Sequence, residues 1–403
     1  MLKEFRSETP PAELDEFIAN LDHHSEFYRK NYYNILERLN QRGGGVLRST
    51  RWNDGFSIVV GYEMLRKVAT DVGRFTNLHG YRVVPSTVMP ALYPNDADGA
   101  DHVFMRKVLN PLFSPKRMAE LQQGVVEDAD RILSELVGRG QFDWATDFAQ
   151  PVTGRVTMRL LGLPEEEWAD YSHPIHNAAF CIGSLESRLA GGAAFARKVH
   201  EEVKRLVARP DATGLIGELS RTELEGRRIT TDDIERIVLN IIIGGLDTTQ
   251  ATLSCAAVFL GRNPDRKQEL QRHPERIRNA TLELLRVFGS APMTGRYNAG
   301  DIELEGFHFP NGEATLLFWT SGNFDPAFVD RPMEVDFTRS AGRNMTFAAG
   351  PHSCLGQYLS KMELEVMIAA LVNTDYELVE EGIVVPEDIS ATVAYLNVPC
   401  RVG

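Results

Sequence analysis

One stretch near the C-terminal end dominates the sequence: FAAGPHSCLG, residues 347–356. A strand-like run over 344–347 leads into it, and apolar residues at spacings of three and four predict a long amphipathic helix over 355–369. A thiol at such a junction faces unpaired backbone N–H groups and the positive end of the helix dipole, and both favour the thiolate. The pattern therefore predicts that Cys354 is an iron ligand.

Two glycines, Gly350 and Gly356, bracket this cysteine. Because they lack side chains, a flat cofactor can approach the loop closely, and the backbone can turn N–H groups toward sulfur. Other uses of the thiol stay open on the residues alone. Cys354 could be a nucleophile with His352 as its base, although such a pair normally needs an orienting third group. A zinc site would need two more ligands, and Cys400 has no spacing that favours one.

The chain as a whole is acidic. Its 403 residues carry a formal charge of -13 with a pI near 5.3, which argues against a general affinity for nucleic acid or anionic membranes. No segment reaches the roughly 20 consecutive apolar residues that span a bilayer. Four cysteines without close pairs suit a reducing compartment. We therefore expect a soluble, cytoplasmic monomer with no nucleic-acid or membrane partner.

Helical periodicity continues through most of the chain, without a linker or an internal repeat. This predicts one mainly α-helical domain over 1–403, with small β-sheets. Short strands are expected around an Asn-Asp-Gly turn at 53–55 and in a hairpin over 302–312. Helices are expected over 12–39, 62–71, 101–113, 118–137, 144–161, 165–208, 230–260 and 277–287.

The longest expected helix begins at a capping box formed by Thr230 and Asp233 and carries Gly-Gly-Leu-Asp-Thr-Thr at 244–249. Each glycine costs roughly 1 kcal/mol relative to alanine, so something must compensate. One explanation is a close helix crossing, with a threonine hydroxyl bonded to the backbone four residues earlier. The other is a flat ligand against the first glycine, with Asp247 and Thr248 available for proton delivery.

One stripe of this helix collects the candidate pocket residues, because positions three, four, seven and eight apart share a face. Asn240 is its odd polar member, which could bond a substrate oxygen or be satisfied by neighbouring protein. The apolar, proline-rich loop over 80–94 could line the same cavity or simply pack on the core. The stripe contains Asn240, Ile243, Gly244, Asp247 and Thr248.

Three weaker signals lie elsewhere. His102 and Arg106 share a helix face and could grip a carboxylate, although such pairs are common on solvated helices. Arg296 is a similar single cation before the 302–312 hairpin. Glu283 and Arg286, three apart, could form a partly buried ion pair.

In combination these motifs resemble the cytochrome P-450 superfamily. Phe-x-x-Gly-x-His-x-Cys-x-Gly follows Glu-x-x-Arg by about 70 residues, and Gly-Gly-x-Asp-Thr-Thr stands about 40 residues earlier still. The resemblance extends from about Tyr62 to the C-terminus. It implies a mainly helical triangular prism with small sheets, with haem b between the long central helix and the cysteine loop. It also implies an O2-dependent monooxygenase.

The resemblance assigns roles to individual residues. Cys354 matches the axial thiolate, which donates electron density to iron and favours O–O cleavage. Asp247 and Thr248 match the acid and alcohol that deliver protons to bound dioxygen. Positions matching the haem contacts are His102, Arg106, Gly244, Arg296, Phe347, Gly350, His352, Cys354 and Gly356. Candidate substrate contacts are Asn240, Ile243, Gly244, Ala391 and Thr392.

The sequence departs from the family pattern at two places. Ala348 stands where many relatives have glycine, and this change should tighten the cysteine loop. The arginine that usually joins the Glu283–Arg286 pair aligns near Glu334, so the third member of that cluster is not identified.

Finer motifs look most like the soluble bacterial camphor hydroxylase group. That likeness implies electrons from an iron–sulfur ferredoxin with its reductase, docked on a basic patch of Arg106, Lys107, Arg343 and Lys361. It favours a compact terpenoid with one oxygen as substrate, while fatty acids, steroids and small aromatics stay open. The non-enzymatic alternative is a haem-thiolate sensor or carrier, which would have no need of the Asp247–Thr248 pair.

Overall fold

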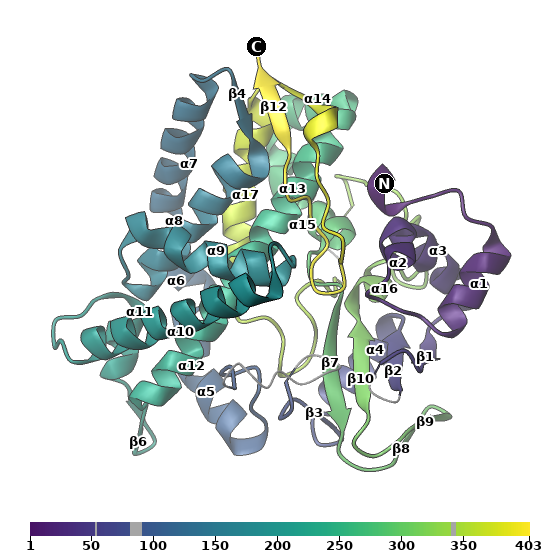
Figure 1. Ribbon diagram of the computed structural model, residues 1–403, viewed down its shortest axis with the longest axis horizontal. Coiled ribbons are helices and arrows are strands. Elements are labelled where there is room, and N and C mark those ends of the chain that lie inside the picture. Colours follow the sequence, from purple (N-terminus) through teal and green to yellow (C-terminus); the bar gives the residue numbers. More distant parts are fainter. Residues whose placement is uncertain (53–54, 81–90, 340–343) are drawn as a thin grey trace.

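The computed structural model describes residues 1–52, 55–80, 91–339 and 344–403. A helical region and a smaller sheet-containing region lie side by side (Figure 1). Helices α12 (Thr231–Gly245) and α13 (Asp247–Arg262) follow one another as a long rod that reaches from the lower edge of the helical region into its centre. The mainly α-helical class with small sheets, predicted from the sequence, is confirmed.

The rod begins as predicted but does not run unbroken. The Thr230 side chain accepts from the Asp233 N–H and the Asp233 carboxylate accepts from the Thr230 N–H, which confirms the capping box. A bend at Leu246 divides the expected single helix into two. Together, Thr231–Arg262 is long and apolar enough to cross a bilayer, but 72% of its most apolar window is buried inside the protein. This burial identifies Thr231–Arg262 as a helix of the protein core.

A five-stranded sheet forms the other region, in the order β1 (Gly45–Ser49), β2 (Phe56–Val60), β10 (Ala314–Phe318), β7 (Met293–Asn298) and β3 (Phe75–Thr76). β10 pairs parallel with β2, and the other neighbours are antiparallel. Every residue of β2 and β10 is buried, which fits their continuous apolar runs. The sheet matters for function because β7 carries Arg296.

The predicted strand pairs are confirmed with shifted bounds. The first strand ends at Ser49, before the exposed Trp52, and residues 53–54 of the expected turn lie outside the described part of the chain. The 302–312 hairpin forms from β8 (Ile302–Leu304) and β9 (Phe307–Phe309). Other short strands are β4 (Gln141–Asp143), β5 (Glu223–Leu224), β6 (Arg227–Arg228), β11 (Tyr376–Leu378) and β12 (Pro399–Val402).

The expected helices are present, most of them in shorter pieces. A π-helix, Trp144–Ala149, leads into α8, and the helix expected over 165–208 breaks between α9 and α10. The described helices are α1 (Pro11–Ala19), α2 (Glu26–Lys30), α3 (Tyr32–Arg42), α4 (Tyr62–Thr70), α5 (Gly99–Leu112), α6 (Pro115–Ala119), α7 (Gln122–Val137), α8 (Gln150–Leu161), α9 (Trp168–Ala179), α10 (Leu185–Val207), α11 (Gly214–Ser220), α14 (Pro264–Arg272), α15 (Ile277–Phe288), α16 (Trp319–Asn323) and α17 (Gln357–Asn373), besides α12 and α13.

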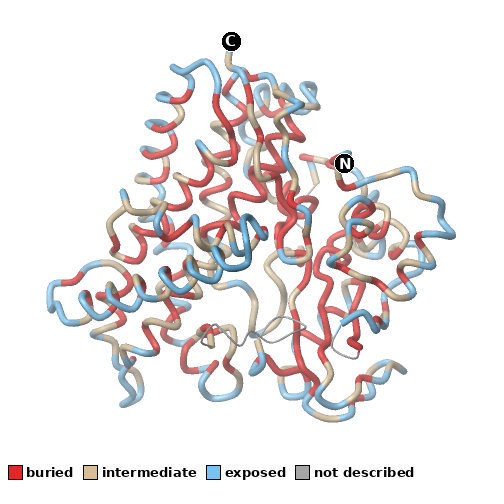
Figure 2. The backbone as a smooth tube through the Cα atoms, in the orientation of Figure 1, coloured by how far each residue is buried: buried red, intermediate tan, exposed pale blue. Residues whose placement is uncertain are grey.

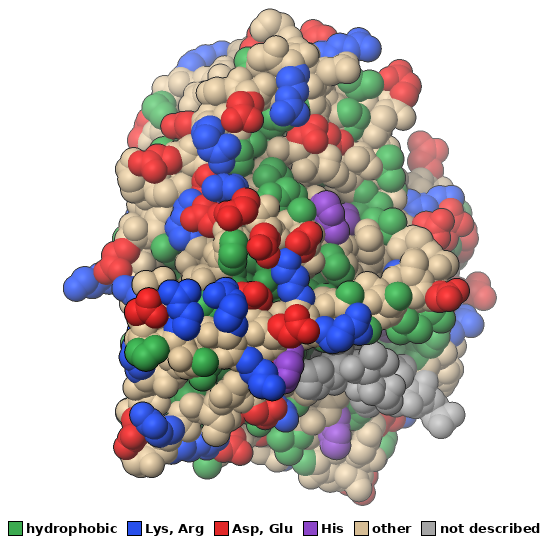
Figure 3. Space-filling view, turned by 60° about the vertical axis from the view of Figure 1, so that its left-hand side comes forward, with side chains coloured by type: hydrophobic (Ala, Val, Ile, Leu, Met, Phe, Trp, Pro, Cys, Tyr) green, Lys and Arg blue, Asp and Glu red, His purple; other side chains and the backbone are tan. Residues whose placement is uncertain are grey.

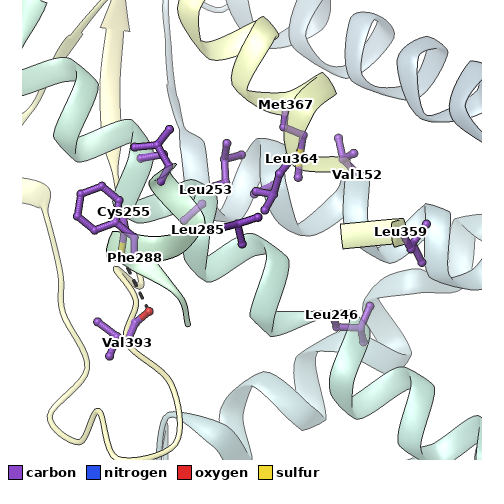
Figure 4. Packing of buried hydrophobic residues seen from close by; sticks show 14 of the residues in the cluster. Val152, Leu246, Leu253, Cys255, Leu285, Phe288, Leu359, Leu364, Met367 and Val393 are labelled. Atoms are coloured by element: carbon purple, nitrogen blue, oxygen red, sulfur yellow. Dashed lines mark hydrogen bonds between the residues drawn. The ribbon is translucent and has the colours of Figure 1, made fainter. Parts of the chain in front are cut away.

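The core runs along the central rod. Buried backbone follows α13 and the middle strands of the sheet, whereas much of α10 is exposed (Figure 2). Leu253 of α13, Leu285 of α15 and Leu364 of α17 are each at most 2% exposed and pack together (Figure 4). The helix after the cysteine, the central helix and the Glu-x-x-Arg helix therefore share one core, which fixes the two walls of the site relative to each other.

Candidate active site

The cysteine lies in a loop held by side chains and not by a strand. The strand predicted over 344–347 is wrong: this segment turns, because Asn323 Oδ1 accepts the Met345 N–H at 2.6 Å and removes a donor that a strand partner would use. The Cys354 N–H then donates to Phe347 O at 2.9 Å and closes the loop just before α17.

Two residues of the loop have a positive φ, which is a left-handed backbone conformation. Gly350 has φ 75°, and a Cβ there would lie 2.5 Å from the carbonyl oxygen of Ala69. Ala348 has φ 57°, a left-handed conformation that costs an L-residue roughly 1–2 kcal/mol. The alanine at this position is thus accommodated with strain that the glycine of many relatives would avoid.

The Cys354 thiol is accessible, yet it lies deep enough for burial to act on it. Burial raises the pKa of this thiol, against the lowering effect of the Gly356 N–H, the Arg106 charge, Lys361 and the Gln357 N–H. The backbone donors expected from the sequence are present, but they do not by themselves make the thiol acidic. A bound metal ion would supply the missing positive charge, because a coordinating thiol loses its proton.

Helix α5 brings His102 and Arg106 to this loop. Arg106 donates to Ser353 O at 2.9 Å, and the His102 ring stacks on His352 with centroids 4.0 Å apart. His102 is 5% exposed, and its Nε2 is buried without a hydrogen-bond partner in the part of the chain that the structure describes. Burial, followed by the neighbouring His352, lowers the pKa of His102 to about 4, so the ring is neutral.

Arg296 on β7 is a second buried donor that needs an acceptor. It is 3% exposed, and its Nε has no hydrogen-bond partner among the described residues. Burial lowers its pKa to about 10, while the charge of Asp98 acts in the other direction. His352 differs, since its Nδ1 accepts from Asn77 at 3.2 Å and its Nε2 pairs with Asp98 at 2.9 Å. The unused donors that an anion could bind therefore belong to His102 and Arg296.

The two glycines of the central helix serve different purposes. A Cβ on Gly245 would lie 3.3 Å from the Thr157 hydroxyl of α8, so a close helix crossing exists there. A Cβ on Gly244 would meet no atom within 4 Å, so this residue faces open space. Thr248 donates to Gly244 O at 2.7 Å, the back-bond anticipated from the sequence. The helix crossing is therefore confirmed at Gly245, and a flat ligand against Gly244 stays a prediction with which the open space is compatible.

Asp247 has a partner that the sequence did not reveal. This acid is 4% exposed, and its Oδ1 accepts from His176 Nδ1 of α9 at 2.8 Å, while its Oδ2 is buried without a partner. The two residues are 71 positions apart, and His176 belongs to no motif. Only the packing of α9 over the central helix brings them together.

Asn240 is satisfied by neighbouring protein. It donates to Tyr93 O at 3.0 Å and accepts from Asn95 Nδ2 at 3.2 Å, which leaves its amide committed to the segment after residue 90. Residues 81–90 of the loop expected to line the cavity lie outside the described residues. Of the other substrate candidates, Ile243 is half-buried, Ala391 is exposed and Thr392 is buried. Asn240 thus anchors the loop, and a direct substrate contact stays a prediction.

The C-terminal loop contacts α13, the second half of the central helix. Cys255 of α13 lies 4.0 Å from Val393 O, next to Thr392 (Figure 4). The Tyr395 N–H donates to Ser254 Oγ at 3.0 Å. These bonds hold the loop that carries Ala391 and Thr392 against α13, the helix that follows α12 and its Gly244.

The missing third member of the ion cluster is Arg339. Glu283 and Arg286, both 3% exposed, form two hydrogen bonds at 2.7 and 2.8 Å, and Arg339 Nε adds a third at 3.2 Å to Glu283. Arg286 also donates to the carbonyls of Asn323, Pro332 and Glu334. The cluster ties α15 to the segment that leads into the cysteine loop.

The sequence is similar to known proteins of one family. Residues 193–393 match the family model described as Cytochrome P-450. Cytochrome P-450 CYP199A2 of Rhodopseudomonas palustris is 31% identical over 281 residues, 68% of this chain and 68% of that one. The chain belongs to the cytochrome P-450 family. A steroid C26-monooxygenase of Mycobacterium tuberculosis is 28% identical over 299 residues, 72% of this chain and 80% of its own.

The architecture of this cytochrome P-450 agrees with solved structures. CalO2 superposes with a TM-score of 0.85 at 23% identity, covering 96% of this chain and 99% of its own. The protein is an oxygen-dependent, haem-thiolate monooxygenase, and its residues fit haem b. Two buried donors without partners, on His102 and Arg296, suit the haem carboxylates. Among the described residues, a Cβ on Gly244 or on Gly356 would meet no atom within 4 Å, so neither position blocks a flat ring.

The open space at Gly244 leads to a testable difference between the two glycines. Gly244→Ala should stabilise the haem-free protein by up to about 1 kcal/mol, because alanine favours helix and meets no neighbour. The same methyl should weaken substrate binding several-fold in a spectral titration, since it enters the site. Gly245→Ala is the matched control and should lower the melting temperature by crowding Thr157. A Gly244→Ala protein less stable than Gly245→Ala would contradict this assignment.

Proposed function

We propose that this cytochrome P-450 hydroxylates a compact, largely apolar terpenoid, acting as a single-domain cytoplasmic monomer that receives electrons from an iron–sulfur ferredoxin. The observation that carries this proposal is the arrangement of Asp247 and Thr248 beside the open space at Gly244. A sensor or carrier has no use for a buried acid at that position. The haem, when bound, supplies oxygen activation, and the protein residues bind it, orient it and move protons.

The proposed roles follow from the contacts. Cys354 is the iron ligand, and the N–H groups of Gly356 and Gln357 bond its sulfur. His102, Arg106 and Arg296 bind the haem carboxylates, while His352 supports the His102 ring by stacking. Phe347 lies beside the loop, with Lys361 Nζ 4.9 Å from its ring centroid. Gly350 permits the turn of the loop.

We assign proton delivery to Asp247 and Thr248. Asp247 Oδ2 is buried and has no partner, so this oxygen can bond a water molecule or pass a proton on. The Thr248 hydroxyl donates to Gly244 O and keeps its oxygen lone pairs available as acceptors. Such a hydroxyl can hold a water molecule at the open face of the helix.

The substrate is proposed from the residues near the open space. Ile243, Ala391 and Thr392 are small or apolar, which suits a compact molecule with few polar groups. A steroid is the second candidate, because one relative is named a steroid C26-monooxygenase.

A substrate screen tests this proposal. Terpenoids that displace water from the iron should shift its spin state at lower concentrations than fatty acids or small aromatics. Asn240→Leu should weaken terpenoid binding about tenfold, because it releases the loop bonded through Tyr93 and Asn95. Terpenoids that give no spin-state shift, or no hydroxylated product with NADH, ferredoxin and reductase, would refute the substrate assignment. Unchanged terpenoid affinity in Asn240→Leu would refute only the proposed role of Asn240 in anchoring that loop.

The ferredoxin is proposed to dock near the cysteine loop. A depression of about 460 Å³ lies on the outer side of this loop, and Ser353, Gln357 and Lys361 contribute to its lining. The expected basic patch is only partly available, because Lys107 pairs with Glu225 at 2.7 Å and Arg106 bonds Ser353 O. Arg343 lies outside the described residues. On the face shown in Figure 3, positive and negative side chains are intermixed.

A further inference from the structure

We propose that His176 is a positioning residue that hands solvent protons to Asp247. The inference rests on the proposed role of Asp247 in proton delivery. Nothing in the sequence motifs requires a histidine on α9, and the structure pairs it with a buried acid. The pair offers a route by which a solvent proton could reach Asp247.

The hydrogen bond joins a partly exposed histidine, His176, to a more deeply buried acid, Asp247. The Asp247 side chain is 5% exposed and the His176 side chain 10%, and the bond between Oδ1 and Nδ1 is 2.8 Å long. The imidazole thus contacts the acid through one nitrogen while part of its ring surface remains exposed. An imidazole can take up a proton at one nitrogen and release another from the second.

Unpartnered polar atoms lie on the same face of the central helix. Gln250 is 0% exposed, and neither its Oε1 nor its Nε2 has a hydrogen-bond partner. Residues three apart share a helix face, so Gln250 lies one turn from Asp247, whose Oδ2 is also unpartnered. These three buried polar atoms, which have no partner among the described residues, could bond ordered water next to the acid.

The proposed transfer conserves protons. A solvent proton binds His176 Nε2, the Nδ1–H bond breaks, and an O–H bond forms on Asp247 Oδ1. Rotation of the carboxyl group then presents this O–H to the water site and toward Thr248. Loss of the proton restores the carboxylate, and His176 returns to its starting tautomer by releasing the Nε2 proton to water and taking up a proton at Nδ1.

Few other charged groups compete for His176. Aromatic Phe180 lies 4.8 Å from its ring centroid. On α10, the buried Nε of Arg188 has no partner, one turn before Gly191, which faces Pro174 of α9. Ion pairs on neighbouring elements join Lys198 with Glu167 and Asp170, His200 with Glu235, Arg155 and Arg159 with Asp128 and Glu165, and Arg236 with Asp232.

The test combines turnover with a structural signal. His176→Gln keeps an N–H donor for Asp247 but cannot relay a proton. It should lower kcat about tenfold with KM unchanged, divert reducing equivalents to peroxide, and flatten the pH dependence of turnover between about pH 6 and 8. His173→Gln, an exposed histidine on the same helix, is the control and should leave kcat and the pH profile unchanged.

A second readout does not depend on turnover. In the reduced carbon monoxide form, the ¹⁵N signal of His176 Nδ1, identified by its loss in His176→Gln, should change in Asp247→Asn. If this signal is the same in Asp247→Asn, or if His176→Gln keeps the wild-type kcat and pH profile while Asp247→Asn is slow, the relay is refuted and the role of Asp247 stands. If Asp247→Asn itself turns over normally, the proposed proton delivery is refuted instead.

Discussion

Replacing Cys354 with alanine is expected to abolish hydroxylation while leaving the fold intact. Loss of an outer-shell partner of a metal ligand typically costs about 10–100-fold in affinity or activity, so loss of the ligand itself should cost about a hundredfold or more. The backbone of the loop should survive, because its closing bond from Cys354 N to Phe347 O uses no side chain. Turnover and haem content after purification measure the two effects.

A matched cysteine separates ligand loss from general damage. Cys181, whose φ is 56°, is exposed like Cys354 and lies outside the cysteine loop. Alanine at this position therefore removes an accessible thiol without changing the loop. Cys181→Ala should retain full turnover and haem content. If Cys354→Ala hydroxylates as fast as Cys181→Ala, the cysteine is not the catalytic ligand.

The second large effect is expected at the buried ion cluster. Glu283→Gln removes a charge that pairs with Arg286 and Arg339, and it leaves the 3%-exposed Arg286 without its carboxylate. Breaking one side of a buried pair typically costs about 3–5 kcal/mol. Because the cluster ties α15 to the segment before the cysteine loop, haem retention should fall along with the melting temperature.

The chain contains its own control for this substitution. Glu63 and Arg66 on α4 have the same spacing and form a 3.1 Å hydrogen bond, but their side chains are 49% and 53% exposed. An exposed pair of this kind contributes about 0–1 kcal/mol, so Glu63→Gln should barely change stability. Equal destabilisation by the two substitutions would show that burial of the cluster is not what stabilises the fold.

Local patterns predicted much of this molecule. The capping box at Thr230 and the helix after the cysteine involve residues close in sequence, and both are present. The amphipathic stripe expected in that helix is wrong, because its apolar residues lie on more than one face and the buried ones include Leu364, Met367 and Leu371. The glycine pair could also be interpreted, although two alternatives were needed because the sequence does not show which glycine meets a neighbouring helix. The strand expected at 344–347 failed because Asn323, a distant side chain, takes one of its backbone donors.

Long-range pairings were beyond sequence reasoning. Arg339 joins Glu283 across 56 positions, His176 joins Asp247 across 71, and Asn240 bonds Tyr93 across 147. None of these pairs follows a periodic pattern, because each depends on how separate helices and loops pack. The sheet order, with β10 between β2 and β7, has the same origin.

The central claim, iron ligation by the Cys354 thiolate, is tested most directly by the carbon monoxide difference spectrum of the reduced protein. The account predicts a Soret band at the long-wavelength position typical of haem-thiolate proteins, and predicts its loss in Cys354→Ala. A band at the shorter-wavelength position of histidine or neutral thiol ligation in the intact, substrate-competent protein would contradict it.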